Sequence, residues 1–183
     1  FAEVLKHGLI EDKKYFEACI IAYNNETINW QDIIKKSINI KSNVVAQDPT
    51  EKGLRKILNF GHTAGHAFES YSLLNHQKPL LHGEAVILGI LFSLKLSMIS
   101  NLLPETIGNA ICQQLLAIYS FDFLASFDEI QIKELILNDK KNNSPAMQFI
   151  VLKDIGNAVY DFEITKKDFN TAYEFVLKSI ENS

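Results

Sequence analysis

Apolar residues recur at helical spacing through the first half of the chain. In residues 2–22 the spacing predicts helix with a break near Glu11-Asp12, and over Trp30 to about Gln47 it predicts a second helix. Proline and glycine in residues 48–53 mark a turn. A third helix, from about Arg55 to Leu73, is expected to follow this turn, and a loop then leads to residue 82.

The second half continues the helical pattern and adds one small sheet. The most apolar run, residues 85–100, is shorter than the roughly 20 residues that span a bilayer, and it is interrupted by Lys95, so we expect a buried central helix. The later helices are expected near 105–118, 129–137 and 165–180. Residues 148–152 and 158–162 flank a Gly-Asn turn and predict a short hairpin. The fold class is therefore mainly α, a single multi-helix domain with one short β-hairpin.

Length, charge and cysteine content narrow the class of protein. A chain of 183 residues with 47% hydrophobic residues can bury one proper core. The net charge of −4 argues against a nucleic-acid-binding surface. Cys19 and Cys112 lie far apart in sequence, which fits a reducing, cytoplasmic compartment better than a disulfide scaffold. The start of the chain has no signal-peptide pattern and no initiating methionine, and we expect it to be the latter part of something longer.

The most informative segment is the histidine run between residues 55 and 69. Steps of four, three and four would place Arg55, Asn59, His62 and His66 on one stripe of a single helix. Such polar groups are costly to bury unpaired, so the stripe predicts the wall of a polar site, and Gly61 and Gly65 are expected to let a ligand come close.

A metal site is one interpretation of this run, and chance is the other. Two histidines four residues apart are common in helices, and a zincin would need glutamate where Thr63 stands. A third histidine, His82, strengthens the metal interpretation, because a catalytic zinc takes three protein ligands, histidine or carboxylate, and keeps one position open.

The charged residues around this run also have simple structural explanations. Glu3 and Lys6 would form an exposed ion pair, and Lys41 would be a solvated helix lysine. Asp48 and Glu51 would be helix-start acids. His7 and His76 are expected at the surface, and Lys140 and Lys141 in a charged loop. Alternatively, Lys6, Lys41, Arg55, Lys140 and Lys141 together would form a cationic cup for the phosphate and carboxylate of a small polyhydroxylated substrate.

Five segments in order resemble the C-terminal domain of 3-dehydroquinate synthases. They are Ala2-Glu-Val-Leu-Lys6, Asp48 with Glu51 to Arg55, Asn59-Phe-Gly-His-Thr-Ala-Gly-His66, His82-Gly-Glu84 and Asp139-Lys-Lys141. The resemblance implies the C-terminal half of a two-domain enzyme whose N-terminal NAD-binding domain is absent from this chain.

The resemblance also implies site residues and cofactors. Its metal ligands, for zinc (or cobalt), are Glu3, His62 and His82. Its substrate-binding residues are Lys6, Lys41, Arg55, Asn59, and Lys140 or Lys141. Glu51 and His66 are assigned to proton transfer. NAD is the second cofactor, and its contacts are expected mostly in the N-terminal domain, since no glycine-rich dinucleotide fingerprint follows a strand here.

The implied reaction converts 3-deoxy-D-arabino-heptulosonate 7-phosphate to 3-dehydroquinate and phosphate in the shikimate pathway of aromatic amino acid biosynthesis. The implied partner is thus a small phosphorylated sugar acid, with a homodimer as the full-length form and neither nucleic acid nor membrane. Two alternatives remain open. One is another sugar-phosphate cyclase, of the deoxy-inosose or valiolone type; the other is a non-catalytic helical domain with a structural metal.

Overall fold

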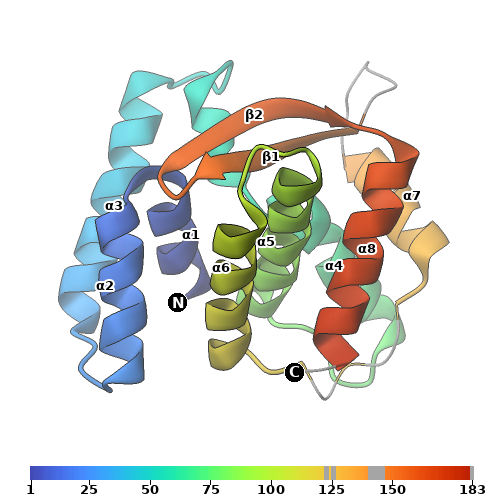
Figure 1. The fold of residues 1–183 in the computed structure, drawn as a ribbon, viewed down its shortest axis with the longest axis horizontal. Helices are drawn as coiled ribbons and strands as arrows, with labels where there is room; N and C mark the ends of the chain where they lie inside the picture. Colours follow the sequence, from blue (N-terminus) through green and yellow to red (C-terminus); the bar gives the residue numbers. More distant parts are fainter. Residues whose placement is uncertain (122–123, 125–126, 140–146, 182–183) are drawn as a thin grey trace.

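Two central helices, α4 (His62–Asn75) and α5 (His82–Ile99), organise the computed structural model, which describes residues 1–121, 124, 127–139 and 147–181 (Figure 1). The other helices are α1 (Ala2–Glu11), α2 (Lys13–Asn24), α3 (Trp30–Gln47), the 3-10 helix η1 (Leu54–Asn59), α6 (Glu105–Ile118), α7 (Glu129–Asp139) and α8 (Lys166–Glu181). The strands are β1 (Met147–Asp154) and β2 (Asn157–Ile164). The predicted mainly α class with one hairpin is confirmed.

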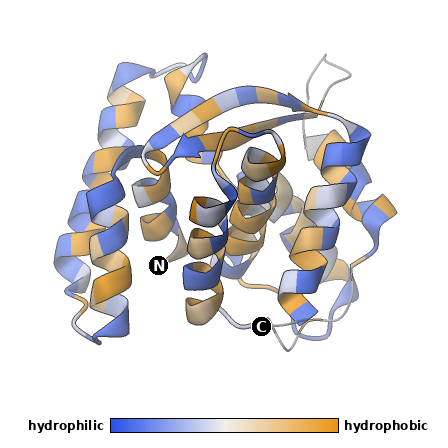
Figure 2. Ribbon diagram, viewed as in Figure 1, coloured by the Kyte–Doolittle hydropathy of each residue, from blue (hydrophilic) through white to orange (hydrophobic). Residues whose placement is uncertain are grey.

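Helix α5 is the core of the domain because it is apolar on every side. All residues from Ala85 to Leu94 are buried, and α5 packs against α4, α8, α6, α1 and β1 (Figure 2). A helix without a polar face is stable only when other elements surround it. By length and composition α5 would also pass as a membrane span, but 72% of it is buried inside the domain. The predicted buried central helix is confirmed.

The hairpin crosses one end of the helical core (Figure 1). Its strands pair antiparallel from Met147 with Ile164 to Asp154 with Asn157. Two hydrogen bonds attach it to helices: the Gly156 amide donates to the Leu9 carbonyl (2.8 Å), and the Leu152 amide donates to Ser97 Oγ (2.9 Å). The hairpin therefore has a fixed position over α1 and α5.

The predicted helix from Arg55 to Leu73 is wrong, because the chain forms two separate elements there. Residues Leu54–Asn59 are the 3-10 helix η1, and α4 begins only at His62. Between them Gly61 has φ +76°, a left-handed conformation that ends one element and redirects the chain into the next. Arg55 and Asn59 consequently do not share a helix with His62 and His66.

The glycines of this run serve helix packing, which differs from the predicted role of admitting a ligand. A Cβ on Gly65 would lie 2.9 Å from the Ala85 carbonyl oxygen, and one on Gly89 would overlap the Gly61 carbonyl oxygen. Side chains at these positions would hold α4 and α5 apart. The small residues thus allow the two backbones to approach each other directly.

Replacement of Gly89 by alanine is expected to separate α4 from α5. Because backbone atoms, not a flexible side chain, oppose the new methyl group, Gly89→Ala should lower the free energy of unfolding by about 3 kcal/mol or more. Urea denaturation followed by circular dichroism measures this. Gly83→Ala is the matched control, since its Cβ meets only Ala2 Cβ at 3.5 Å and should change stability by about 1 kcal/mol or less. Equal effects of the two substitutions would contradict the packing argument.

Neither of the two histidines expected at the surface is exposed. His7 is only 4% exposed, and its Nδ1 lies 2.7 Å from Ser37 Oγ on α3. His76 is partly buried, and its Nδ1 lies 2.9 Å from Ser72 Oγ. Burial, followed by the ammonium of Lys6, lowers the pKa of His7 from 6.5 to about 4. His7 is therefore a neutral member of the core at neutral pH.

The neutral state of His7 predicts a loss of stability in acid. Below pH 6.5 the unfolded chain binds a proton at His7, whereas the folded chain binds it only near pH 4. The free energy of unfolding should therefore fall between pH 7 and pH 5, with about 2 kcal/mol of the fall due to His7. Urea midpoints with a chelator present measure it, and His7→Gln should flatten the pH dependence. An unchanged slope in His7→Gln would show that His7 titrates normally.

Candidate metal and substrate site

Three separate helix starts converge on one point. Glu3 lies in the first turn of α1, His62 is the first residue of α4, and His82 is the first residue of α5. One ligand atom from each of these residues lies within 4.8 Å of those of the other two. The three predicted metal ligands, from positions far apart in sequence, are therefore neighbours in the fold.

Hydrogen bonds orient both imidazoles toward this point. His62 Nδ1 lies 3.2 Å from the Phe60 carbonyl oxygen, and His82 Nδ1 lies 3.2 Å from Glu69 Oε2. A carbonyl or carboxylate oxygen only accepts, so each Nδ1 carries the proton. In a neutral imidazole the other nitrogen, Nε2, then has a lone pair available for a metal ion.

Glu3 and His62 present two acceptor atoms to each other. Glu3 Oε1 is buried, lies 3.3 Å from His62 Nε2, and has no hydrogen-bond partner in the part of the chain that the structure describes. Two lone pairs at this distance repel unless a cation lies between them. Ligands about 2.0–2.1 Å from a tetrahedral zinc would be separated by about 3.4 Å. The donor set and spacing fit a divalent metal.

Lys6 supplies the fixed charge beside these ligands, and it is buried instead of forming the predicted exposed ion pair. Its side chain is 3% exposed, and its ammonium donates to Glu3 Oε2 (2.9 Å) and to the Leu58 carbonyl (2.6 Å). Burial lowers the pKa of Lys6, and the Glu3 carboxylate opposes that effect. Because an ammonium has three N–H donors, one remains beyond these two bonds.

The charge of Lys6 also determines the ionisation of both neighbours. Desolvation raises the pKa of Glu3, but Lys6 and then His62 more than offset this, so the pKa lies below its usual value. Desolvation and Lys6 lower the pKa of His62 to about 4. Glu3 is thus a carboxylate and His62 a neutral imidazole at neutral pH, which are the forms that bind metal.

A cavity of about 180 Å³ adjoins two of the three predicted ligands, Glu3 and His62, and brings most of the predicted substrate-binding residues together. Its lining consists of Glu3, Lys6, His7, Lys41, Glu51, Arg55, Leu58, Asn59 and His62. Four of the six predicted substrate residues are among them, and three of those are cationic. The other two, Lys140 and Lys141, lie outside the described residues.

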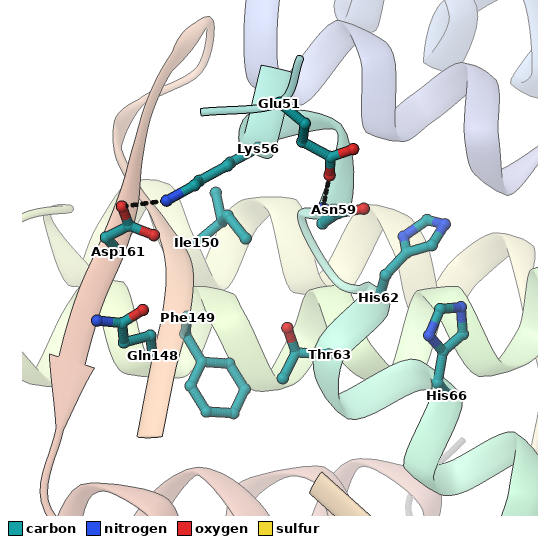
Figure 3. A pocket seen from close by; sticks show the side chains of 10 residues that line it. All are labelled: Glu51, Lys56, Asn59, His62, Thr63, His66, Gln148, Phe149, Ile150 and Asp161. Carbon is teal, nitrogen blue, oxygen red and sulfur yellow. Dashed lines mark hydrogen bonds and ion pairs between the residues drawn. The ribbon is translucent and has the colours of Figure 1, made fainter. Parts of the chain in front are cut away.

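A larger cavity of about 440 Å³ continues from the first across His62 and contains His66 (Figure 3). Figure 3 shows both histidines projecting from successive turns of α4. The two cavities share Glu51, Asn59 and His62. The predicted proton-transfer residues, Glu51 and His66, thus border the same cavity as His62, one of the predicted metal ligands.

The turn before η1 fixes Glu51 and Arg55. Asp48 accepts hydrogen bonds from the amides of Gly53 (2.7 Å) and Arg55 (3.1 Å), which bears out its role at a helix start. Glu51 has φ +57°, and its carboxylate accepts from Asn59 Nδ2 (2.8 Å) and lies 3.6 Å from Arg55 Nε. Glu51 therefore has a strained backbone conformation, and its side chain is held by Asn59 and Arg55, so it is more than a helix-start acid.

Several residues of the site are absent from the sequence prediction. The hairpin contributes Gln148, Phe149, Ile150 and Asp161 to the larger cavity, and Asp161 pairs with Lys56 at 2.6 Å. No local motif marks these positions, because tertiary packing alone brings the hairpin to η1. Glu69 could have been found, since it follows His62 and His66 at helical spacing on the same face of α4.

The chain matches one family of known proteins over most of its length. The family described as 3-dehydroquinate synthase C-terminal matches residues 1–142. The 3-dehydroquinate synthase of Parabacteroides distasonis is 34% identical over 182 residues, covering 98% of this chain and 51% of that protein. That of Campylobacter concisus is 36% identical over 178 residues, covering 95% and 50%. The chain spans about half the length of the curated relatives it matches.

Solved structures share the fold at lower identity. The 2-epi-5-epi-valiolone synthase from Streptomyces hygroscopicus subsp. jinggangensis, solved with NAD+ and Zn2+, superposes with a TM-score of 0.79 at 20% identity, over 100% of this chain and 50% of that one. A 2-deoxy-scyllo-inosose synthase complexed with carbaglucose-6-phosphate, NAD+ and Co2+ gives 0.71 at 22% identity, over 97% and 50%. The solved structures show the shared fold; the family match over residues 1–142 shows that the chain belongs to the 3-dehydroquinate synthase family and corresponds to its C-terminal domain.

Proposed function

We propose that this chain is the metal- and substrate-binding half of a 3-dehydroquinate synthase. The reaction would convert 3-deoxy-D-arabino-heptulosonate 7-phosphate to 3-dehydroquinate and phosphate. The observation that carries the proposal is the pair of facing acceptors, the buried Glu3 Oε1 and His62 Nε2, beside a cavity lined by Lys6, Lys41 and Arg55. The names of the relatives at 34–36% identity support the substrate.

Glu3, His62 and His82 would hold zinc or cobalt, and NAD would be the second cofactor. The solved cyclases of the same fold bind NAD+ with Zn2+ or Co2+. Most NAD contacts are proposed to come from an N-terminal domain outside this chain. When bound, the metal would polarise substrate oxygens and NAD would accept and return a hydride.

The chain's own residues would bind the anionic groups of the substrate and hold it in one orientation. Lys6, Lys41 and Arg55 present cations to the smaller cavity, which suits the carboxylate and phosphate of a sugar acid. Asn59, whose amide donates to Glu51, would accept from a substrate hydroxyl. Lys140 and Lys141 are proposed as further phosphate contacts. Fixing a flexible sugar through several bonds lowers the entropic part of the barrier.

Glu51 and His66 are the proposed proton-transfer residues. Both border the larger cavity next to His62, and neither belongs to the triad of ligands. In this arrangement a proton removed from the substrate would be taken up within the cavity by groups other than the proposed metal ligands. His66 contributes an imidazole, the side-chain group that most often transfers protons in enzymes.

The two alternatives fit the site less well. Cyclases of the inosose type act on substrates without a carboxylate, and Arg55, which lines the cavity, would then have no carboxylate to bind. A structural zinc site is usually closed by four protein ligands. Among the described residues only three candidate ligands converge here, and two of them, Glu3 and His62, line a cavity, so a coordination position would be accessible to a substrate.

Metal binding should depend on the three ligands and on the hydrogen bond that orients His82. We expect His62→Ala and His82→Ala to abolish stoichiometric Zn2+ binding, since two ligands do not suffice for a tight site. Glu69→Gln should weaken it by about tenfold or more, because Glu69 fixes the His82 ring. Competition with a chromogenic chelator measures the affinity. His66→Ala is the control and should keep its metal. If both His62→Ala and His82→Ala retain metal, the proposed metal site is wrong.

Substrate preference distinguishes a 3-dehydroquinate synthase from the cyclases of the inosose or valiolone type. The zinc-loaded chain should bind the heptulosonate phosphate more tightly than glucose 6-phosphate or sedoheptulose 7-phosphate, as measured by calorimetry. Arg55→Gln should weaken the heptulosonate by about tenfold, or about 1.4 kcal/mol, and leave glucose 6-phosphate unchanged, because only the former has a carboxylate. An equal loss for both ligands would favour the inosose alternative.

The same preparation tests whether this half is sufficient for catalysis. With NAD+, Zn2+ and the heptulosonate phosphate we expect no steady-state release of phosphate, since the nucleotide contacts are proposed to lie elsewhere. Multiple turnovers by the 183-residue chain would contradict that division of the site.

A further inference from the structure

A buried imidazole that the family motif does not explain lies at the smaller cavity. His7 is 4% exposed, yet its ring is part of the cavity lining, together with Lys6, Lys41 and Arg55. His7 Nε2 is buried and has no hydrogen-bond partner among the described residues. Leaving such an atom unpaired is unfavourable, so a bound group that pairs with it would recover this free energy.

The position of the His7 ring is fixed from the other side. Its Nδ1 lies 2.7 Å from Ser37 Oγ on α3, and α1 and α3 pack together. Tyr15, on α2, donates to the Ile33 carbonyl of the same α3 turn and keeps that turn closed against the core. With Nδ1 engaged by serine, Nε2 is the ring atom that remains for a ligand in the cavity.

The charge state of His7 indicates which ligand group would fit. Burial and Lys6 lower its pKa to about 4, so the imidazole stays neutral beside the cations of the cavity. Glu3, Lys41 and His62 are the other charged or titratable groups that act on it. Phosphate and carboxylate gain more from Lys6, Lys41 and Arg55 than from a neutral ring, whereas a hydroxyl pairs well with a neutral nitrogen.

We propose that His7 is a substrate-binding residue whose Nε2 hydrogen-bonds a hydroxyl of the polyhydroxylated substrate. This proposal rests on the proposed function, because it concerns the same cavity. The cations would bind the charged ends of the substrate, and His7 would orient a hydroxyl-bearing carbon that lies between those ends. His7 would thereby discriminate between sugar acids that differ only at one hydroxyl.

Calorimetry on the zinc-loaded chain tests this with two probes, 3-deoxy-D-arabino-heptulosonate 7-phosphate and inorganic phosphate. His7→Phe should bind the sugar phosphate about tenfold more weakly, and His7→Gln, which keeps a polar end, about threefold or less. Binding of inorganic phosphate and of Zn2+ should not change in either variant. His76→Phe is the matched control, because His76 has the same contact with a serine but is not among the residues that line the cavity.

The outcomes separate this inference from the proposed function. If the wild-type chain binds the sugar phosphate and His7→Phe binds it equally well, the inference is wrong and the proposed function stands. If His7→Phe also loses affinity for inorganic phosphate, the substitution acts through the neighbouring cations, and the inference is likewise wrong. If the wild-type chain binds no sugar phosphate, both fall. Should His7→Phe fail to fold, the ¹⁵N resonance of His7 Nε2 in the wild type should shift on sugar phosphate addition, and an unmoved resonance would refute the contact.

Discussion

The direct backbone contact between α4 and α5 is the constraint on which the site depends. Gly61, Gly65 and Gly89 remove the side chains that would keep the two helices at ordinary spacing. As a result, the first residues of both helices, His62 and His82, lie close together, with ring centroids 5.7 Å apart. A helix packing feature, with no chemistry of its own, thus determines the distance between two proposed metal ligands.

The same arrangement shapes the electrostatics of the site. The N-termini of two helices carry partial positive charge, and the buried ammonium of Lys6 adds a full one. Desolvation and then the Lys6 ammonium disfavour protonation of His62, and Lys6 favours the carboxylate form of Glu3. The positive charges also make the cavity attractive to anions before any metal is bound. The ionisation of Glu3 and His62 and the positive charge of the cavity therefore share Lys6 as a cause.

The sequence predicted the helical class, the buried helix α5 and the set of converging residues far better than it predicted local geometry. Hydrophobic spacing suffices for α5 because its apolar run has no competing explanation. Hydrophobic spacing failed at residues 55–73. There the left-handed conformation of Gly61 divides the chain into two elements, and the apolar pattern carries no sign of this division. The sequence prediction also placed Lys6 and His7 outside the core, because burial of a polar residue depends on partners such as Leu58 and Ser37 that lie 52 and 30 positions away.

The three ligand positions have a mechanical consequence for the first helix. Residue 3 lies 59 positions before residue 62, and residue 62 lies 20 positions before residue 82. An ion that joins them would close two long loops at once, much as a cross-link does. Any opening of α1 would have to break a coordination bond, so exchange of the α1 amide hydrogens should slow as the site fills. Docking of the N-terminal helix and occupancy of the site would then be one equilibrium.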